Sequence, residues 1–324
     1  MPAPAFDALV RWPADWGCRF TLLIDVEEEF DWRAPLDPRH RSTTATRALP
    51  EAHRRFRDAG VAMGLMVDHP IATYPASVDR LAAIVADGRS AIGAQLHAWV
   101  TPPFDEGEGG VADSFQGNLP PALEAAKLDT LVAAIDDAFG TRPRAFRAGR
   151  YGIGPASRAL LASRGFAIDA SVRAYYDYAA GQGPDFARVG NAAYRTDGLV
   201  ELPSTTVFTG AARRHGPNLY RAAAQLARGP GLLARTGLLT RVPLTPEGVP
   251  AADAIAAIDA AIGDGERLLV FSFHSPSLEP GHTPYVRDAA GLARFWAWWD
   301  AVLAHLARRG VANVSIGEVL AAIG

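Results

Sequence analysis

The chain alternates between short apolar runs and amphipathic stretches, and most of the apolar runs end in a polar residue. The first run, residues 19–24, leads directly into Asp25. Similar runs end at Asp68, His97, Arg147, Asp169, Ser204 and His274. Short apolar runs of this kind are typical of buried strands. The pattern therefore predicts strands that deliver polar, chemically useful side chains at their carboxyl ends.

The stretches between these runs have the spacing of helices. Gly60 and Gly165 follow two of them, as glycine commonly does at the end of a helix, and Pro155 opens another. We expect helices over 50–59, 76–86, 121–139, 155–164, 251–262 and 289–309. We expect strands over 19–24, 61–67, 91–96, 144–146, 166–168, 200–202 and 268–273.

Strands that alternate with helices predict an α/β fold with a parallel sheet, and seven or eight such units predict closure into a barrel. We therefore expect a distorted (β/α)7-8 barrel as a single domain over 19–324, preceded by an irregular lead-in over 1–18. The alternative is a doubly wound open sheet, but no G-x-G-x-x-G follows the first strand. A basic, Leu/Ala-rich insertion at about 211–245 interrupts the series. It predicts a lid or a subunit contact, with a peripheral membrane contact as the alternative.

Composition and charge argue against some classes of protein. The 324 residues carry 32 Lys and Arg against 35 Asp and Glu, for a net charge of −3, which argues against nucleic acid as a main partner. Cys18 is the only cysteine, so we expect no disulfide and a cytoplasmic location. The sequence predicts neither a secretory signal peptide nor a transmembrane segment.

The most unusual feature is a group of four carboxylates within residues 25–30: Asp25, Glu27, Glu28 and Glu29. Side chains alternate along an extended strand, so Asp25 and Glu27 should point the same way. Two such carboxylates raise each other's proton affinity unless a cation lies between them. A solvated acidic loop is the alternative interpretation.

Aromatic and basic residues just past the strand ends are candidates for substrate contact. An indole at such a place could stack on a sugar ring. The expected substrate-binding residues are Trp32, Trp99, Arg150 and Tyr151. The alternative for the arginine is a surface charge. The aromatic group 295–299 lies in a predicted helix, and we expect it to pack in the core.

Five motifs in order, IDVE, QLH, FRAG, AIDAS and FSFH, resemble the motif series of carbohydrate esterase family 4, the NodB-homology polysaccharide deacetylases. More narrowly, they are similar to the WalW-like subgroup of lipopolysaccharide-biosynthesis proteins. The resemblance covers about residues 19–320. It implies a distorted (β/α) barrel that removes acetyl groups from N-acetyl sugars with the help of a divalent metal.

The resemblance also implies catalytic roles for individual residues. Asp25 would be the general base that activates water, and Arg147 would orient it. His274 would be the general acid that protonates the leaving amine, and Asp169 would help to hold His274. An acid and a base of different proton affinity on opposite sides of the scissile carbon suit amide hydrolysis.

The implied metal, most simply zinc, would be bound by Glu27 and His97. Thr101 stands where the family has the second histidine of its H-x-x-x-H pair. Catalytic zinc normally has three protein ligands and a water. The third ligand therefore stays open among Asp25, Asp68, His69 and the loop 102–118.

Two functions follow. The first is a metal-assisted C–N hydrolase that acts on an N-acetylated sugar in the synthesis of cell-surface glycan or lipopolysaccharide. The second is a barrel that binds a glycan or a nucleotide-sugar without turnover. The sequence leaves the oligomeric state open.

Overall fold

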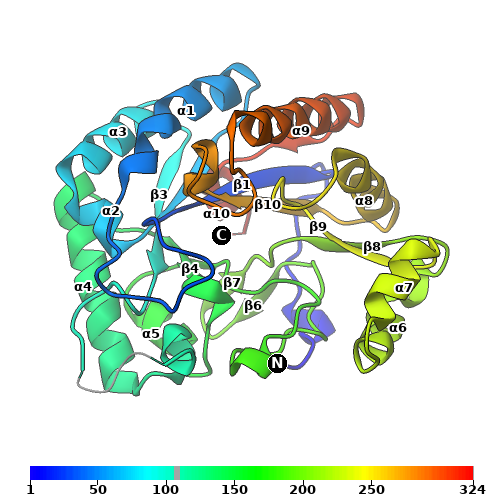
Figure 1. The fold of residues 1–324 in the computed structure, drawn as a ribbon, viewed down its shortest axis with the longest axis horizontal. Helices are drawn as coiled ribbons and strands as arrows, with labels where there is room; N and C mark the ends of the chain where they lie inside the picture. The colour runs from blue at the N-terminus through cyan, green and yellow to red at the C-terminus, as the bar shows by residue number, and fades with distance from the viewer. Residues whose placement is uncertain (106–109, 324) are drawn as a thin grey trace.

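A curled, mostly parallel sheet forms the centre of the computed structural model, which describes residues 1–105 and 110–323 (Figure 1). Its main path has the order β10-β1-β2-β3-β4-β5-β7-β6, and β11 (Ala312–Asn313) adds to β1. Neighbours from β10 to β7 pair in parallel, and only β6 runs antiparallel, against β7. The strands of the path are β1 Arg19–Val26, β2 Met63–Val67, β3 Ala91–Leu96, β4 Ala145–Ala148, β5 Ile168–Asp169, β6 Tyr194–Thr196, β7 Leu199–Glu201 and β10 Leu268–His274.

Helices surround this sheet, with α1 to α5 along one side and α8 and α9 along another (Figure 1). They are α1 Leu49–Asp58, α2 His69–Thr73, α3 Pro75–Val85, α4 Pro121–Phe139, α5 Ser157–Ser163, α6 Gly216–Ala224, α7 Gly229–Arg235, α8 Ala251–Gly263, α9 Ala289–Arg308 and α10 Ile316–Ile323. No helix in the described part of the chain is long and apolar enough to cross a membrane.

A separate pair of strands bridges the gap between the two ends of the sheet. Strands β8 (Thr206–Thr209) and β9 (Thr240–Pro243) form a separate antiparallel pair. At its base, the Thr205 N–H donates to the Val270 carbonyl (3.1 Å), and the Ser272 N–H donates to the Leu244 carbonyl (3.3 Å). The predicted α/β fold, a distorted barrel in a single domain, is confirmed.

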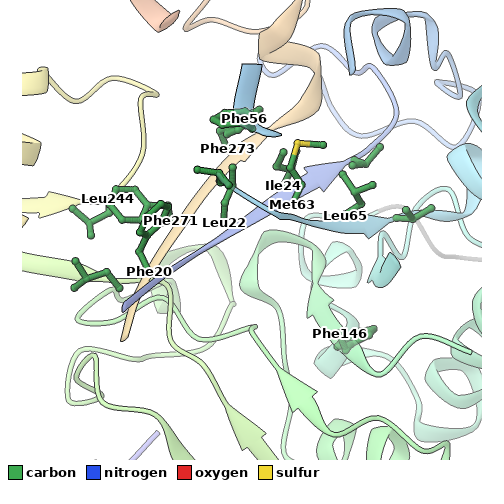
Figure 2. Close-up of a cluster of buried hydrophobic side chains, with 14 of the residues drawn as sticks. Phe20, Leu22, Ile24, Phe56, Met63, Leu65, Phe146, Leu244, Phe271 and Phe273 are labelled. Atoms are coloured by element: carbon green, nitrogen blue, oxygen red, sulfur yellow. The ribbon is translucent and has the colours of Figure 1, made fainter. Parts of the chain in front are cut away.

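Side chains alternate along β1: every second one points outward to the helices, and the others point into the barrel. Figure 2 shows Phe20, Leu22 and Ile24 of β1 in one hydrophobic cluster with Phe271 and Phe273 of β10. This cluster includes buried side chains of α1, α4 and α9, so it fills the layer between sheet and helices. The buried Phe295, Trp298 and Trp299 belong to it, which confirms the expected core role of the 295–299 aromatics.

The alternate residues of β1 point into the barrel. Leu23 packs with Met66, Val270 and Ile316 in a second cluster, in which α10 contributes at the bottom. This packing is tight at Gly64, where an added Cβ would lie 2.6 Å from a Leu23 methyl carbon. Two residues after Leu23, the same inward face reaches Asp25 at the carboxyl end of the strand.

The structure adds detail to the predicted elements in two places. Strand β6 was not predicted, although Asp197 and Gly198, with φ of 48° and 81°, make the two-residue turn of a β6–β7 hairpin. The insertion at 211–245 contains α6, α7 and β9, and Figure 1 shows the two helices at the periphery, beyond β8.

Candidate active site

Asp25 is placed between an arginine and a histidine at the carboxyl end of β1. In the parallel register Asp25 is opposite His274, so both side chains lie on the inner face. The His274 Nε2 lies 3.8 Å from Asp25 Oδ2. On the other oxygen, the Arg147 Nη1 donates to Asp25 Oδ1 at 2.6 Å. Arg147 is 1% exposed and its Nε donates to the Ala170 carbonyl, which fixes the guanidinium. A carboxylate, a guanidinium and an imidazole are thus brought together.

Glu247, which sequence reasoning missed, holds His274. Its Oε2 lies 2.7 Å from His274 Nδ1, and its Oε1 accepts from the His274 N–H (3.2 Å) and the Ser277 hydroxyl (2.5 Å). Burial alone would lower the pKa of His274, but the carboxylates of Glu247, Glu27 and Asp25 outweigh it and raise that pKa well above its ordinary value. These carboxylates favour the protonated form of His274, whose Nε2 faces Asp25.

His97 is held in the opposite protonation state. Burial lowers the pKa of His97 to about 4, so its imidazole is neutral at neutral pH. Its Nδ1 lies 2.7 Å from Glu28 Oε2, and we assign the proton to this nitrogen because the carboxylate accepts it. Glu28 also accepts from the Trp99 indole N–H (2.7 Å). The free lone pair of His97 Nε2 then faces Glu27 Oε2 at 3.5 Å. A carboxylate behind a histidine is the usual support for a metal-binding imidazole.

Gly149, the glycine of the FRAG motif, is required for steric reasons. A Cβ on Gly149 would lie 2.5 Å from His97 Cδ2 and 2.7 Å from the Leu96 carbonyl. Because real Cβ atoms do not approach so closely, the His97 ring occupies its place only if residue 149 has no side chain.

Within residues 1–105 and 110–323, two groups of acidic and histidine side chains are close enough to hold a metal ion: Asp25, Glu27 and His274, and Glu28, Asp68 and His97. In the second group the two Asp68 oxygens already accept the N–H groups of Ile71 and Glu28, both at 2.8 Å. Asp68 caps α2 and supports Glu28, and His69 does not line the cavity described below. Of the third ligands expected from sequence, Asp25 belongs to the first group and Asp68 to the second.

Glu27 is the clearest metal-ligand candidate. It is 3% exposed, and its Oε1 has no hydrogen-bond partner among the described residues. Burial above all, together with Asp25, Glu28 and Asp68, raises the pKa of Glu27 well above its ordinary value, against the opposing effect of His274. A buried carboxylate with a free oxygen, facing an unprotonated His97 nitrogen, fits a cation.

Thr101 lies beside this site without lining it. Its N–H donates to the His97 carbonyl (3.1 Å), and in the part of the chain that the structure describes its buried hydroxyl has no hydrogen-bond partner. Lys127 fixes the loop by donating to the carbonyls of Ala98, Thr101 and Pro103 at 3.0, 2.8 and 2.7 Å. Of the loop 102–118, residues 106–109 lie outside the described residues.

A cavity of about 440 Å³ opens above Asp25. All four expected substrate-binding residues line it: Trp32, Trp99, Arg150 and Tyr151. The Trp32 ring meets His274 edge-on at 4.9 Å between centroids, and the Trp99 ring stacks on His97 at 4.2 Å. The indoles therefore buttress the two histidines as well as forming part of the wall.

Asp169 does not reach His274, contrary to the role expected for it. It is fully buried below the cavity, accepts the Ser171 N–H (3.0 Å), and lies 3.5 Å from the Nε of Arg158. The same guanidinium donates to Glu201 at 3.1 Å. Asp169 ends β5 and pairs in register with Glu201 of β7. In the strand order, β1, β2, β3 and β4 all lie between β5 and β10, which is why a different carboxylate holds His274.

The comparisons with known proteins concern the fold. No family model and no curated protein matches the chain. A Mycobacterium smegmatis protein proposed to be a polysaccharide deacetylase superposes with a TM-score of 0.52 at 18% identity, over 98% of both chains. A GH57-type branching enzyme from Pyrococcus horikoshii superposes with a TM-score of 0.51 at 11% identity, over 94% of this chain and 70% of that one. The two differ in activity, so the likeness shows a shared barrel and leaves the chemistry to the site.

Proposed function

We propose that this protein is a hydrolase of the carbohydrate esterase family 4 type that removes the acetyl group from an N-acetylated sugar. The observation that carries the proposal is the position of Asp25, between the Arg147 guanidinium at 2.6 Å and the His274 imidazole at 3.8 Å. This is a carboxylate base opposite a cationic acid at the floor of one cavity. Amide hydrolysis needs both.

The residues divide the work as follows. Asp25 takes a proton from the attacking water, and Arg147 orients the carboxylate through its hydrogen bond to Oδ1. His274, held by Glu247, donates its Nε2 proton to the departing amine. Trp32 and Trp99 flank the sugar on the cavity wall.

Glu27 and His97 would hold a divalent metal, with Asp25 next to it. Zinc is our first choice because it accepts mixed nitrogen and oxygen ligands. A bound divalent cation would polarise the acetyl carbonyl and the attacking water. Its positive charge would also stabilise Glu27 as a carboxylate.

A second candidate function, binding of a glycan or nucleotide-sugar without turnover, is favoured by Thr101. A neutral hydroxyl that does not line the cavity replaces an imidazole of the family's metal site. Metal analysis together with an acetate-release screen separates the two functions.

The cellular setting belongs to the proposal as well. The resemblance supports a cytoplasmic step in cell-surface glycan or lipopolysaccharide synthesis. The insertion 211–245 has six arginines and no carboxylate, and Leu226, Leu232 and Leu238 are exposed on it. This composition supports a peripheral contact with an anionic membrane.

The proposed function is tested by acetate release. The purified protein, with and without added Zn²⁺, is incubated with a panel of N-acetylated sugars, and acetate is assayed in a coupled reaction. Release that depends on the intact site supports the hydrolase. Tight binding of a panel member without release by metal-loaded protein would favour the non-hydrolytic function.

We expect Glu247→Gln to lower kcat by about 10- to 100-fold with a smaller change in KM, since the amide no longer stabilises the imidazolium. Glu247 raises the pKa of His274, so its loss lowers that pKa, and the alkaline limb of the kcat profile should move to lower pH. Glu51→Gln, an exposed change on α1, is the control. An unshifted pH profile with normal kcat would remove Glu247 from the mechanism.

We expect Glu27→Gln to lower Zn²⁺ affinity by at least about 10-fold, because the amide is a neutral and poorer ligand. Calorimetric titration measures this directly. In metal-free protein the same change should leave the melting temperature equal or higher, because a buried carboxyl group that resists ionisation is replaced by a neutral isostere. Equal Zn²⁺ affinities in the two proteins would exclude Glu27 as a ligand.

A further inference from the structure

One wall of the cavity carries two guanidinium groups without a carboxylate partner. Arg150 and Arg173 both line the cavity. Arg150 donates to the Ser114 hydroxyl and lies 4.3 Å from the centroid of the Phe115 ring. Arg173 lies over the rings of Tyr176 (4.0 Å) and Tyr151 (5.5 Å). Within the described residues neither forms an ion pair, whereas Arg147, deeper in the same cavity, is paired with Asp25.

The surroundings hold Arg173 in place without neutralising it. The Tyr176 ring that carries Arg173 also carries Arg241, at 3.6 Å, so two like charges contact one ring. Arg241 further contacts Tyr220 and donates to the Tyr175 carbonyl. Cation–π contacts contribute only about 0.5–2 kcal/mol each and leave the full positive charge in place.

Cations without an anionic partner reduce the stability of the folded protein. A guanidinium cannot discharge itself by losing a proton at any working pH. A partly buried cation therefore needs a partner of opposite charge. Backbone strain adds to the cost, because Arg150 and its neighbour Tyr151 both have positive φ, 54° and 59°. An anion that enters with the substrate would supply the missing charge.

The other side of the cavity carries negative charge, which would orient an anionic substrate. Asp25, Glu27 and Glu247 surround the proposed reaction centre, and Asp31 lies further out. An anionic group would be repelled from these carboxylates and attracted to the arginine wall. A substrate with one charged end would then be bound in a single orientation.

We propose that the natural substrate carries an anionic group, a carboxylate or a phosphate, which Arg173 and Arg150 bind while its N-acyl group lies between Asp25 and His274. The planar guanidinium matches either anion through paired N–H donors. This inference rests on the proposed function for the position of the N-acyl group. The anion site itself can be tested by binding alone.

The test is calorimetric titration of the Asp25→Asn protein, so that no probe is consumed. Three probes are compared: neutral N-acetylglucosamine, its 1-phosphate, and the matching 2-acetamido uronate. We expect at least one anionic probe to bind about 10- to 100-fold more tightly than the neutral one, as one or two charge-assisted hydrogen bonds would produce. The preferred probe identifies phosphate or carboxylate as the anion.

Arg173→Gln in the same background should remove this preference while the affinity for the neutral probe stays unchanged. Arg173→Lys should keep part of it. The control is Arg294→Gln, an exposed change on α9 that should have no effect. The proposal is overturned if no anionic probe binds more tightly than the neutral one, including when none binds, or if Arg173→Gln keeps the preference. Acetate release by the unmodified protein is a separate readout, so a failed deacetylase assay with intact anion preference would count against the proposed function alone.

Discussion

Replacing Asp25 with asparagine is expected to lower kcat/KM by about 10²- to 10⁴-fold, the usual contribution of a general base. The amide cannot accept a proton from water, yet its oxygen can still accept the Arg147 hydrogen bond that Asp25 Oδ1 accepts at 2.6 Å. The shape of the site is therefore kept while its basicity is lost. The measurement is the rate of acetate release from the best substrate of the panel.

The control for this prediction is the same chemical change at an exposed position. Asp300→Asn on α9 removes one carboxylate far from the cavity and should leave the rate unchanged. Circular dichroism and the urea midpoint of each variant establish that both are folded. A folded Asp25→Asn protein with near-normal turnover would eliminate Asp25 as the base.

The residues that sequence reasoning placed well are those on regular strands. Asp25, His97, Arg147 and His274 each follow an apolar run, and in a parallel sheet the carboxyl ends of neighbouring strands meet at one edge. The alternation along a strand also sends Asp25 and Glu27 toward the same cavity. Local pattern and sheet geometry were sufficient for these positions.

The supporting residues could not be found in this way. Glu247 lies in the connection between β9 and α8, 27 positions before His274, and nothing local marks it as the partner of that histidine. Glu28 could have been noticed, since its carboxylate follows Glu27 and must point to the other side of the strand end. Its role behind His97 depends on β3 lying two strands from β1. Loop partners of this kind are determined by tertiary packing.

The position of Asp169 at a strand end was predicted correctly, but its contacts were not. It lies at the end of β5 as the pattern predicts. Its contacts, however, depend on Arg158 of α5 and Glu201 of β7, which a strand pattern cannot connect to it. Together these three residues form a buried network that supports the barrel wall.

This network leads to the largest stability effect that we expect. In Arg158→Met, the carboxyl groups of Asp169 and Glu201, both fully buried, lose their only cationic partner among the described residues. Removing one member of a buried charge network typically costs about 3–5 kcal/mol. Urea unfolding at pH 7 of the variant and of the unmodified protein measures the difference.

The loss should depend on pH in a definite direction. Burial above all, and then Asp169, already raises the pKa of Glu201 well above its ordinary value, and Arg158 opposes that rise. Without Arg158 the folded-state pKa of Glu201 rises further above the unfolded one. A raised carboxyl pKa reduces stability as the pH rises from the unfolded pKa through the folded one. The difference between Arg158→Met and the unmodified protein should therefore be larger at pH 8 than at pH 5.

The matched control is Arg164→Met, which breaks the partly exposed pair with Asp129 at 2.6 Å. Exposed pairs contribute about 0–1 kcal/mol, so this variant should unfold close to the unmodified protein. Combining Arg158→Met with Asp169→Asn and Glu201→Gln should recover most of the loss, because no buried charge is then left without a partner. A loss in Arg158→Met no larger than in Arg164→Met would mean that water or another group neutralises the two carboxyls, and the network would not support the barrel wall.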